Sequence, residues 1–147
     1  MTRFLHIADI HLGYQQYGLS ERFDDFSKVF INLVEEALKR QVDFVLLAGD
    51  LFHKRTVNPL AMRVAVAGLG TLRDAGVPVL AVEGNHEKAY YRDQYSWLEF
   101  LDAMGYLRLL NPSFEEGQAV LTPHGEGGGA YADLAGGIRV YGLKYYG

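Results

Sequence analysis

Three clusters of polar side chains stand out in this sequence, because each follows a short apolar segment. They are Asp9-Ile10-His11, Gly49-Asp50-Leu51-Phe52-His53 and Gly84-Asn85-His86-Glu87. Carboxylate, imidazole and amide groups suit Mn, Fe, Co or Zn and disfavour copper(I) and iron–sulfur chemistry. The chain has no cysteine, which excludes thiolate metal sites and disulfide bonds. The clusters therefore predict a metal site with mixed oxygen and nitrogen ligands.

The spacing within the clusters suits a shared site. Asp9 and His11 are two residues apart, so in an extended chain both side chains point the same way. Gly49 and Gly84 allow the backbone to turn sharply at the end of the second and third apolar segments. Each cluster alone is more typical of a turn or a cap. Their joint occurrence after three successive segments favours the functional interpretation.

The apolar segments are expected to be buried parallel strands joined by helices. The predicted strands span residues 2–8, 43–48 and 77–82, and the predicted helices span 20–40, 59–75 and 95–104. Alternation of strands and helices is typical of an α/β fold with a mainly parallel sheet covered on both faces. Ligands of such sheets bind at the carboxyl ends of the strands, where all three clusters fall.

Residue types also predict where helices begin and end. Ser20 is a candidate N-cap for the first helix, and Asn58 followed by Pro59 is a strong start for the second. Gly76 is expected to end that helix. In the third helix one apolar side is predicted, and it consists of Trp97, Leu98, Leu101 and Met104.

The last third of the chain has a different pattern. Short strands are expected at 107–110, 118–122 and 137–141, with a Gly-rich connection at 124–129 in which His124 is interpreted as a loop residue. The chain stops directly after a strand-like segment. We therefore expect residues 1–147 to form a single, truncated domain.

Composition restricts the classes of protein to consider. The chain has 147 residues, of which 49% are hydrophobic and 22% charged, as in an ordinary globular domain. It contains no run of about 18 apolar residues that would predict a membrane span, and no signal peptide, so the cytoplasm is the default location. The net charge of −4 argues against nucleic-acid binding by bulk charge. Binding of a polyanion must therefore use a local cluster or a metal.

These motifs resemble the calcineurin-like metallophosphoesterase superfamily, which has Asp-x-His, then Gly-Asp, then Gly-Asn-His in this order. Within it, the three clusters are similar to those of the double-strand-break repair nucleases of the bacterial SbcD type. The discriminating piece is Leu51-Phe52-His53 after Gly49-Asp50, because protein phosphatases of the superfamily usually continue with an Asp-Arg-Gly ending. The resemblance covers residues 1–112 and implies the first half of a four-layer αββα sandwich, with a mainly parallel sheet flanked by helices.

The resemblance also implies a ligand set. Asp9 and His11 would bind a first metal, Asp50 would bridge two metals, and Asn85 would bind the second through its amide oxygen. The implied cofactor is Mn²⁺, with two ions in a complete site. Two cations about 3.5–4 Å apart activate water and neutralise charge on the phosphoryl oxygens.

Three further residues receive roles from the resemblance. His86 would lie beside the scissile phosphate and stabilise it or assist the leaving oxygen, and His53 would lie near the substrate phosphate rather than on a metal. Glu87, where the family often has Asp, is a candidate acceptor for a histidine ring.

The chain departs from the family in one important respect. The later family motifs supply three more histidines, including a Gly-His-x-His pair, and this sequence has none of them. We therefore expect this chain to bind Mn²⁺ weakly or at one position, or not at all, and to hydrolyse DNA poorly or not at all.

Cationic and aromatic residues follow two of the clusters. Lys54, Arg55, Lys88, Tyr90 and Arg92 are candidates for contacts with DNA, since cations hold phosphates and tyrosines touch sugars or bases. The alternative is a solvated loop, because most exposed Lys and Arg residues serve solubility.

The resemblance further implies protein partners. The family dimerises through helices in this region, for which the candidates are Leu60, Val64, Leu98 and Leu101. The alternative is that these residues face the sheet, and periodicity does not separate the two. The family also binds an SMC-like ABC ATPase, through segments that this chain lacks.

Three functions remain open from the sequence. The favoured one is the N-terminal part of a Mn-dependent DNA repair exonuclease or endonuclease. A second is another phosphoesterase that acts on small substrates such as nucleotides, or on phosphoproteins. A third is a non-catalytic dimerisation or interaction module, which the missing histidines favour.

Overall fold

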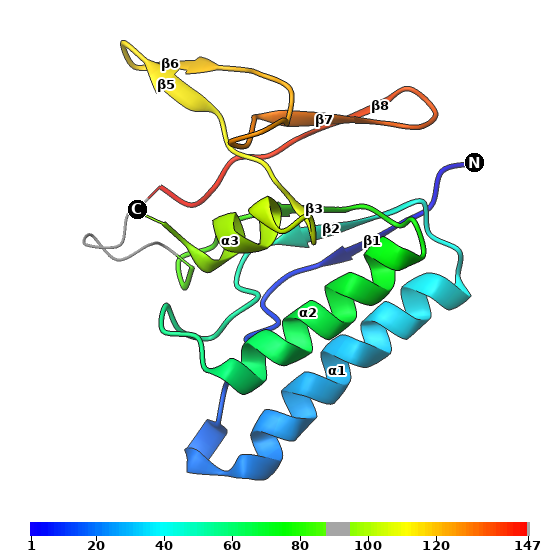
Figure 1. The fold of residues 1–147 in the computed structure, drawn as a ribbon, viewed down its shortest axis with the longest axis vertical. Coiled ribbons are helices and arrows are strands. Elements are labelled where there is room, and N and C mark those ends of the chain that lie inside the picture. The colour runs from blue at the N-terminus through cyan, green and yellow to red at the C-terminus, as the bar shows by residue number, and fades with distance from the viewer. Residues whose placement is uncertain (88–94, 147) are drawn as a thin grey trace.

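The computed structural model describes residues 1–87 and 95–146, which form a parallel sheet with helices on one face (Figure 1). The sheet has the order β1-β2-β3-β4 and all its strands are parallel. Its strands are β1 (Phe4–Ile7), β2 (Phe44–Ala48), β3 (Val79–Val82) and β4 (Arg108–Leu109). The helices are α1 (Ser20–Lys39), α2 (Pro59–Asp74) and α3 (Trp97–Ala103), preceded by a short 3₁₀ turn, η1 (Gln16–Gly18). The predicted α/β fold class is confirmed.

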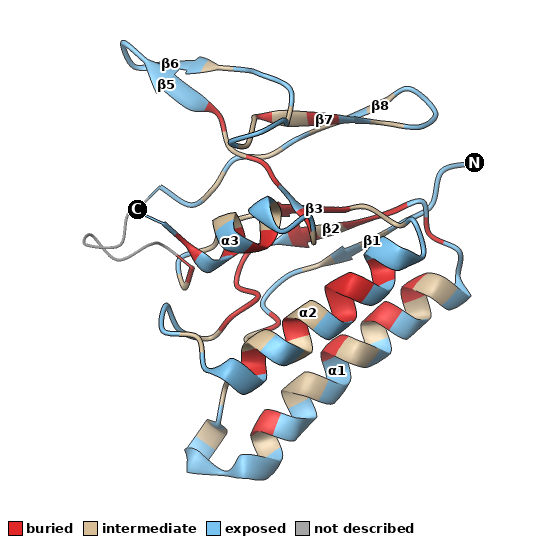
Figure 2. Ribbon diagram, viewed as in Figure 1, coloured by how far each residue is buried: buried red, intermediate tan, exposed pale blue. Residues whose placement is uncertain are grey.

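Chain order explains why the helices share one face. The strands follow one another in sequence, so right-handed crossovers place each connecting helix on the same side of the sheet. Alternate strand residues point to that side, and Val45, Leu47 and Ala81 join Phe30 of α1 and Leu69 of α2 in the main core. Figure 2 shows that buried and exposed residues alternate along both long helices. This layer fixes the strands whose ends carry the polar clusters.

The second face of the sheet is covered by strands rather than helices. Two hairpins, β5 (Ser113–Glu115) with β6 (Gln118–Val120) and β7 (Tyr131–Leu134) with β8 (Ile138–Tyr141), lie on the side opposite to α1 and α2 (Figure 1). Phe44, Leu80 and Leu110 form a second core with Ala132 of β7. The sequence predicted β6 and β8 but missed β5 and β7. The resulting order of layers, α then β then β, is the one expected for half of an αββα sandwich.

Of the two helix caps predicted from the sequence, the structure has one. Oδ1 of Asn58 accepts a hydrogen bond of 2.7 Å from the backbone N–H of Ala61, and Pro59 is the first helical residue, as predicted. The predicted cap at Ser20 is wrong, because Ser20 already belongs to α1 and the preceding Leu19 offers no side-chain cap. Ser96 caps α3 in a reciprocal arrangement with Glu99.

The predicted apolar side of α3 is only partly correct. Leu98 and Leu101 are fully buried in the core, whereas Trp97 and Met104 are exposed. Leu98 and Leu101 therefore face the sheet. The expectation that they form a dimer surface is wrong, because neither side chain has any exposed area. Leu60 on α2 is exposed and remains a candidate, as does the half-buried Val64.

No helix in the described ranges, 1–87 and 95–146, is long and apolar enough to cross a membrane. The longest, α1, carries charged residues along its exposed side. Arg22 pairs with Asp25, and Arg40 pairs with Glu36 at the other end of the helix.

Candidate metal centre

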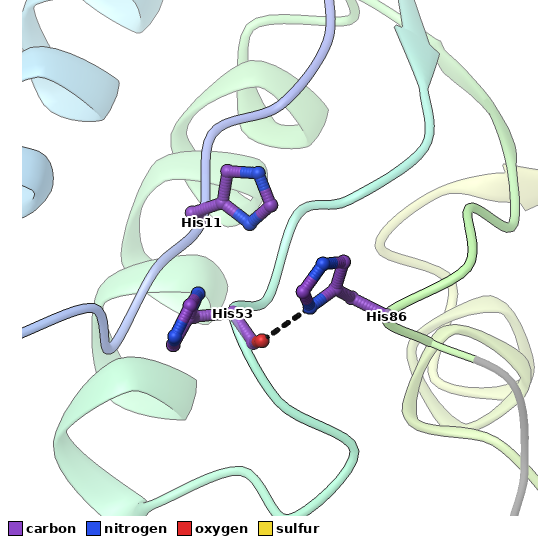
Figure 3. Close-up of side chains that lie close together, drawn as sticks. All are labelled: His11, His53 and His86. Carbon is purple, nitrogen blue, oxygen red and sulfur yellow. Dashed lines mark hydrogen bonds between the residues drawn. The ribbon is translucent and has the colours of Figure 1, made fainter.

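The three polar clusters meet at the carboxyl edge of the parallel sheet, as predicted. Asp9 and His11 follow β1, Asp50 follows β2 and His86 follows β3. One ligand atom each of Asp9, His11 and Asp50 lies within 4.8 Å of the other two. Nitrogen atoms of His11, His53 and His86 also lie within 4.8 Å of one another, and Figure 3 shows the three rings on three different segments of chain. Both groups contain His11, so one edge of the sheet gathers five potential ligands.

The residues of the first group have an unusual backbone. Asp9, His11 and Asp50 have φ values of 55°, 52° and 55°, in the left-handed region that residues other than glycine rarely adopt. The N–H of Asp9 donates to the carbonyl of Gly49 at 3.2 Å, and the N–H of His11 donates to the carbonyl of Asp50 at 2.9 Å. These bonds hold the strained conformation in place. Strain of this kind concentrates at functional sites.

Two glycines allow the loops after β2 and β3 to touch. A Cβ atom on Gly49, whose φ is +85°, would lie 2.9 Å from both the Cα and the N atom of Gly84. Because real Cβ atoms do not approach backbone so closely, a side chain at position 49 would push the loops apart. The predicted need for glycine at both strand ends is thereby explained.

The position of the hydrogen on the His86 ring follows from one contact. Nδ1 of His86 lies 2.6 Å from the backbone oxygen of His53 (Figure 3). A carbonyl oxygen only accepts, so Nδ1 carries the hydrogen and donates it. Nε2 of the neutral ring then has a free lone pair, which can bind a cation or take up a proton.

Glu87 contacts backbone rather than a histidine ring. Its carboxylate accepts hydrogen bonds from the N–H groups of Asp50 at 2.8 Å, Phe52 at 3.1 Å and Gly84 at 2.9 Å. The expectation that Glu87 receives a histidine N–H is therefore wrong. Burial raises the pKa of Glu87, and the three backbone bonds oppose that increase. Sequence reasoning missed this role because the main partners lie 35 and 37 positions earlier in the chain.

The environment of His53 favours a neutral ring. Burial lowers the pKa of His53, and the neighbouring His11 and His86 lower it further. The centroid of the Tyr14 ring lies 4.2 Å from that of the His53 ring. Nδ1 of His53 and Nδ1 of His11 are buried and have no hydrogen-bond partner among the described residues. A ring nitrogen of His11 also lies within 4.8 Å of carboxylate oxygens of Asp9 and Asp50, and such an imidazole–carboxylate group fits a bound divalent cation.

The other predicted site residues are exposed or lie outside the described residues. Asn85 is exposed in the turn between Gly84 and His86, and its role as a ligand stays a prediction. Lys54 and Arg55 are exposed directly after His53. The remaining predicted DNA contacts, Lys88, Tyr90 and Arg92, lie outside the described residues.

His124 lies in a loop, as predicted, and has a partner. Its Nε2 is 2.9 Å from Oδ1 of Asp102 on α3. Burial raises the pKa of Asp102, and His124 opposes that shift. The pair fastens the Gly-rich loop to α3, so we assign it a structural role.

Comparison with known proteins identifies relatives of the whole chain. Residues 2–143 match the family model described as calcineurin-like phosphoesterase. The chain is 44% identical over 108 residues to the DNA double-strand break repair protein Mre11 of Archaeoglobus fulgidus, a match that covers 74% of this chain and 24% of that protein. It is 39% identical over 145 residues to the protein of the same name from Haloferax volcanii, covering 99% of this chain and 28% of that protein. The protein of the same name from Aeropyrum pernix is 47% identical over 94 residues, a match that covers 64% of this chain and 23% of that protein.

The chain spans about a quarter of the length of these curated relatives. The match in Haloferax volcanii extends over almost all of the present chain, including the hairpins. The resemblance inferred from the three motifs is confirmed at the level of the family, and the similarity to repair proteins agrees with the more specific resemblance.

Proposed function

Because the chain belongs to the calcineurin-like phosphoesterase family, we propose that it is the N-terminal part of a DNA repair nuclease that uses Mn²⁺ to hydrolyse phosphodiester bonds. The observation that carries this proposal is the convergence of Asp9, His11 and Asp50 within 4.8 Å at the edge of the sheet. The similarity to three proteins named for DNA double-strand break repair supports DNA as the substrate.

In this proposal the residues divide into ligands and groups that face the substrate. Asp9 and His11 hold one cation, Asp50 contributes to both cations, and Asn85 contributes to the second. The cations supply charge neutralisation at the phosphoryl oxygens and activate water for in-line attack. A carboxylate–imidazole–amide set of this kind suits Mn²⁺.

His86 and His53 act on the phosphate directly. The contact of His86 Nδ1 with the His53 carbonyl fixes the ring and leaves Nε2 as the working nitrogen. Once Nε2 has taken up a proton, it donates a hydrogen bond to a phosphate oxygen or gives that proton to the leaving oxygen. His53, packed against Tyr14, lies beside the same phosphate.

The ligand set within this chain is smaller than the complete family set. It has no Gly-His-x-His pair, so we expect Mn²⁺ to bind weakly, at one position, and DNA to be cleaved slowly if at all. Exposed Lys54 and Arg55, together with Lys88, Tyr90 and Arg92, are the proposed contacts with the DNA backbone and bases. A second copy of the chain, docked through Leu60 and Val64, and an SMC-like ABC ATPase are the proposed protein partners.

The test is Mn²⁺ binding and DNA cleavage by the chain itself. Calorimetric titration should detect one bound Mn²⁺, and binding should be lost in Asp50→Asn but kept in Glu83→Gln, which alters another buried acid, at the end of the neighbouring strand β3. Any cleavage of linear DNA should need Mn²⁺ and Asp50. A folded wild-type chain that binds no Mn²⁺ at millimolar concentration contradicts the proposal. Fast cleavage that is abolished by Asp50→Ala supports the nuclease and contradicts the expected low activity, and turnover of a small phosphodiester but not of DNA indicates a different substrate.

A further inference from the structure

We propose that Glu87 is a positioning residue, which sets where Asp50 lies relative to Asn85 and His86 and thereby controls metal affinity. The inference rests on the proposed metal-binding function of this edge. Glu87 is only 5% exposed, so it does not contact substrate itself. It acts through the backbone of the two loops that carry the proposed ligands.

The contacts of Glu87 and Asp50 are reciprocal. Glu87, in the loop after β3, accepts from the N–H groups of Asp50 and Phe52 in the loop after β2, at 2.8 and 3.1 Å. Oδ1 of Asp50 in turn accepts from the N–H of His86 in the loop after β3, at 3.0 Å. Each loop therefore supplies a carboxylate that binds the backbone of the other. This exchange fixes their separation and their register.

Among the described residues, backbone hydrogen bonds do not hold the loop after β2 against the loop after β3. Between the loops after β1 and β2, backbone bonds join His11 to Asp50 and Leu12 to Leu51. For residues 49–53 and 83–87, all of which the structure describes, no backbone–backbone hydrogen bond joins the two loops beyond the strand pairing. The carboxylates of Glu87 and Asp50 take the place of a strand ladder there. Of these two, only Glu87 is free of a proposed metal-ligand role.

The chemistry of the side chain predicts which substitutions fail. Both oxygens of Glu87 accept, since Oε2 receives the N–H groups of Asp50 and Gly84 and Oε1 receives that of Phe52. Gln has one oxygen and one NH₂ group, so at least one buried backbone N–H would face a donor and lose its acceptor. Asp keeps both oxygens but is one methylene shorter, so we expect it to restore the contacts in part.

The first test measures the backbone contacts without any metal. In Glu87→Gln, amide hydrogen exchange should accelerate on the order of tenfold or more at one or more of Asp50, Phe52 and Gly84, because at least one buried N–H group loses its acceptor. The amide of Val77, which bonds to the carbonyl of Leu72 in another part of the fold, should be unchanged. Unchanged exchange at all three loop amides would overturn the proposal.

The second test measures Mn²⁺ affinity, which a purely structural role would not alter. Glu87→Gln should weaken Mn²⁺ binding about 10- to 100-fold, the range typical of residues that support metal ligands, and Glu87→Asp should recover part of the loss. Glu83→Gln and Asn58→Ala are the controls. The first alters a buried acid whose carboxylate pairs with Lys144 rather than with the backbone of the loops, and the second lowers stability through α2 alone. Both should bind Mn²⁺ like the wild type.

The outcomes separate this inference from the proposed function. Wild-type Mn²⁺ affinity in Glu87→Gln overturns the positioning role and leaves the nuclease proposal standing. If Glu87→Gln does not fold, Glu87→Asp decides, and wild-type affinity in that variant also overturns the role. Absence of Mn²⁺ binding in the wild-type chain contradicts the proposed function, whereas the exchange experiment still tests the loop contacts.

Discussion

A Cβ atom at position 84 would lie 2.1 Å from Oδ1 of Asp50, so Gly84 and the Asp50 carboxylate occupy adjoining space with no room for a methyl group. We predict that Gly84→Ala displaces Asp50, destabilises the fold by about 1–3 kcal/mol through overpacking, and abolishes Mn²⁺ binding. Urea unfolding and calorimetric titration measure the two effects. Gly125→Ala is the control, because a Cβ there meets nothing within 4 Å. Normal Mn²⁺ binding by Gly84→Ala would contradict the prediction.

Gly68 and Gly70, two residues apart on α2, should respond to alanine in opposite ways. A Cβ on Gly68 would lie 2.4 Å from Cε1 of the buried Phe30 ring, whereas a Cβ on Gly70 would meet Cε1 of Tyr106 at an ordinary 3.5 Å. Gly68→Ala should therefore destabilise the protein by about 1–3 kcal/mol. Gly70→Ala should stabilise it by about 0.5–1 kcal/mol, because alanine restricts the unfolded chain and favours helix. Urea unfolding of the two variants checks the signs, and equal signs would contradict the packing of α1 on α2.

Local patterns predicted the fold and the convergence of the candidate ligands, but not the contacts between distant segments. Asn58-Pro59 marks a helix start by itself, since the cap and its partner Ala61 are three residues apart. The three clusters could be placed at one edge because parallel strands align their carboxyl ends. The sequence singled out Glu87 only because it follows His86 in the third cluster, and it did not predict the contacts of its carboxylate. Its partners are backbone groups, which have no residue-type pattern.

The failed predictions have different physical origins. Ser20 has the residue type of a cap, but the chain enters α1 one residue earlier, after η1. Trp97 has the period of a core residue, yet its indole N–H bonds the carbonyl of Arg55 at the surface. β5 and β7 are short strands. Each is a strand because it pairs with a neighbour, β6 or β8, in an antiparallel hairpin. Trp97 is the case in which a tertiary contact overrides the local preference.

The two candidate caps give a direct test of this distinction. Asn58→Ala should destabilise the protein by about 1 kcal/mol, because the N–H of Ala61 loses its acceptor. Ser20→Ala should change stability by less than about 0.5 kcal/mol, since no side chain caps α1. Thermal and urea unfolding of both variants decide the matter. A larger loss in Ser20→Ala than in Asn58→Ala would show that the assigned helix start is wrong.

The β7–β8 hairpin should make stability depend on pH at acidic values. Arg139 donates to Asp133 at 2.6 and 2.9 Å across the hairpin, and this hydrogen bonding lowers the pKa of the Asp133 carboxyl. A carboxyl whose pKa is lower in the folded state stabilises the fold above its unfolded pKa, and that contribution disappears as the pH falls through the folded pKa. Asp133→Asn should therefore melt slightly below the wild type at pH 7, and the difference should shrink as the pH falls below the ordinary pKa of an Asp carboxyl.

Salt supplies the control for this pair. Both side chains are exposed, so the difference between wild type and Asp133→Asn at pH 7 should shrink in about 1 M NaCl, where screening is strong. Melting temperatures recorded across the pH range, with and without salt, provide the measurement. A difference that grows at low pH would have the wrong sign for a lowered pKa.

The ring of His86 should be locked in one tautomer. Its Nδ1 lies 2.6 Å from the His53 carbonyl oxygen, which cannot donate, so the neutral ring must carry its hydrogen on Nδ1. Long-range ¹H–¹⁵N correlation spectra at pH 8 should show a protonated Nδ1 and an unprotonated Nε2. Addition of Mg²⁺, a diamagnetic stand-in for Mn²⁺ at an oxygen-rich site, should leave Nδ1 protonated, because the carbonyl contact belongs to the protein. The ring of His124, which bonds Asp102 through Nε2, should have its hydrogen on Nε2 and is the internal reference. A neutral His86 ring with its hydrogen on Nε2 and none on Nδ1 would contradict the tautomer assigned from the contact with the His53 carbonyl.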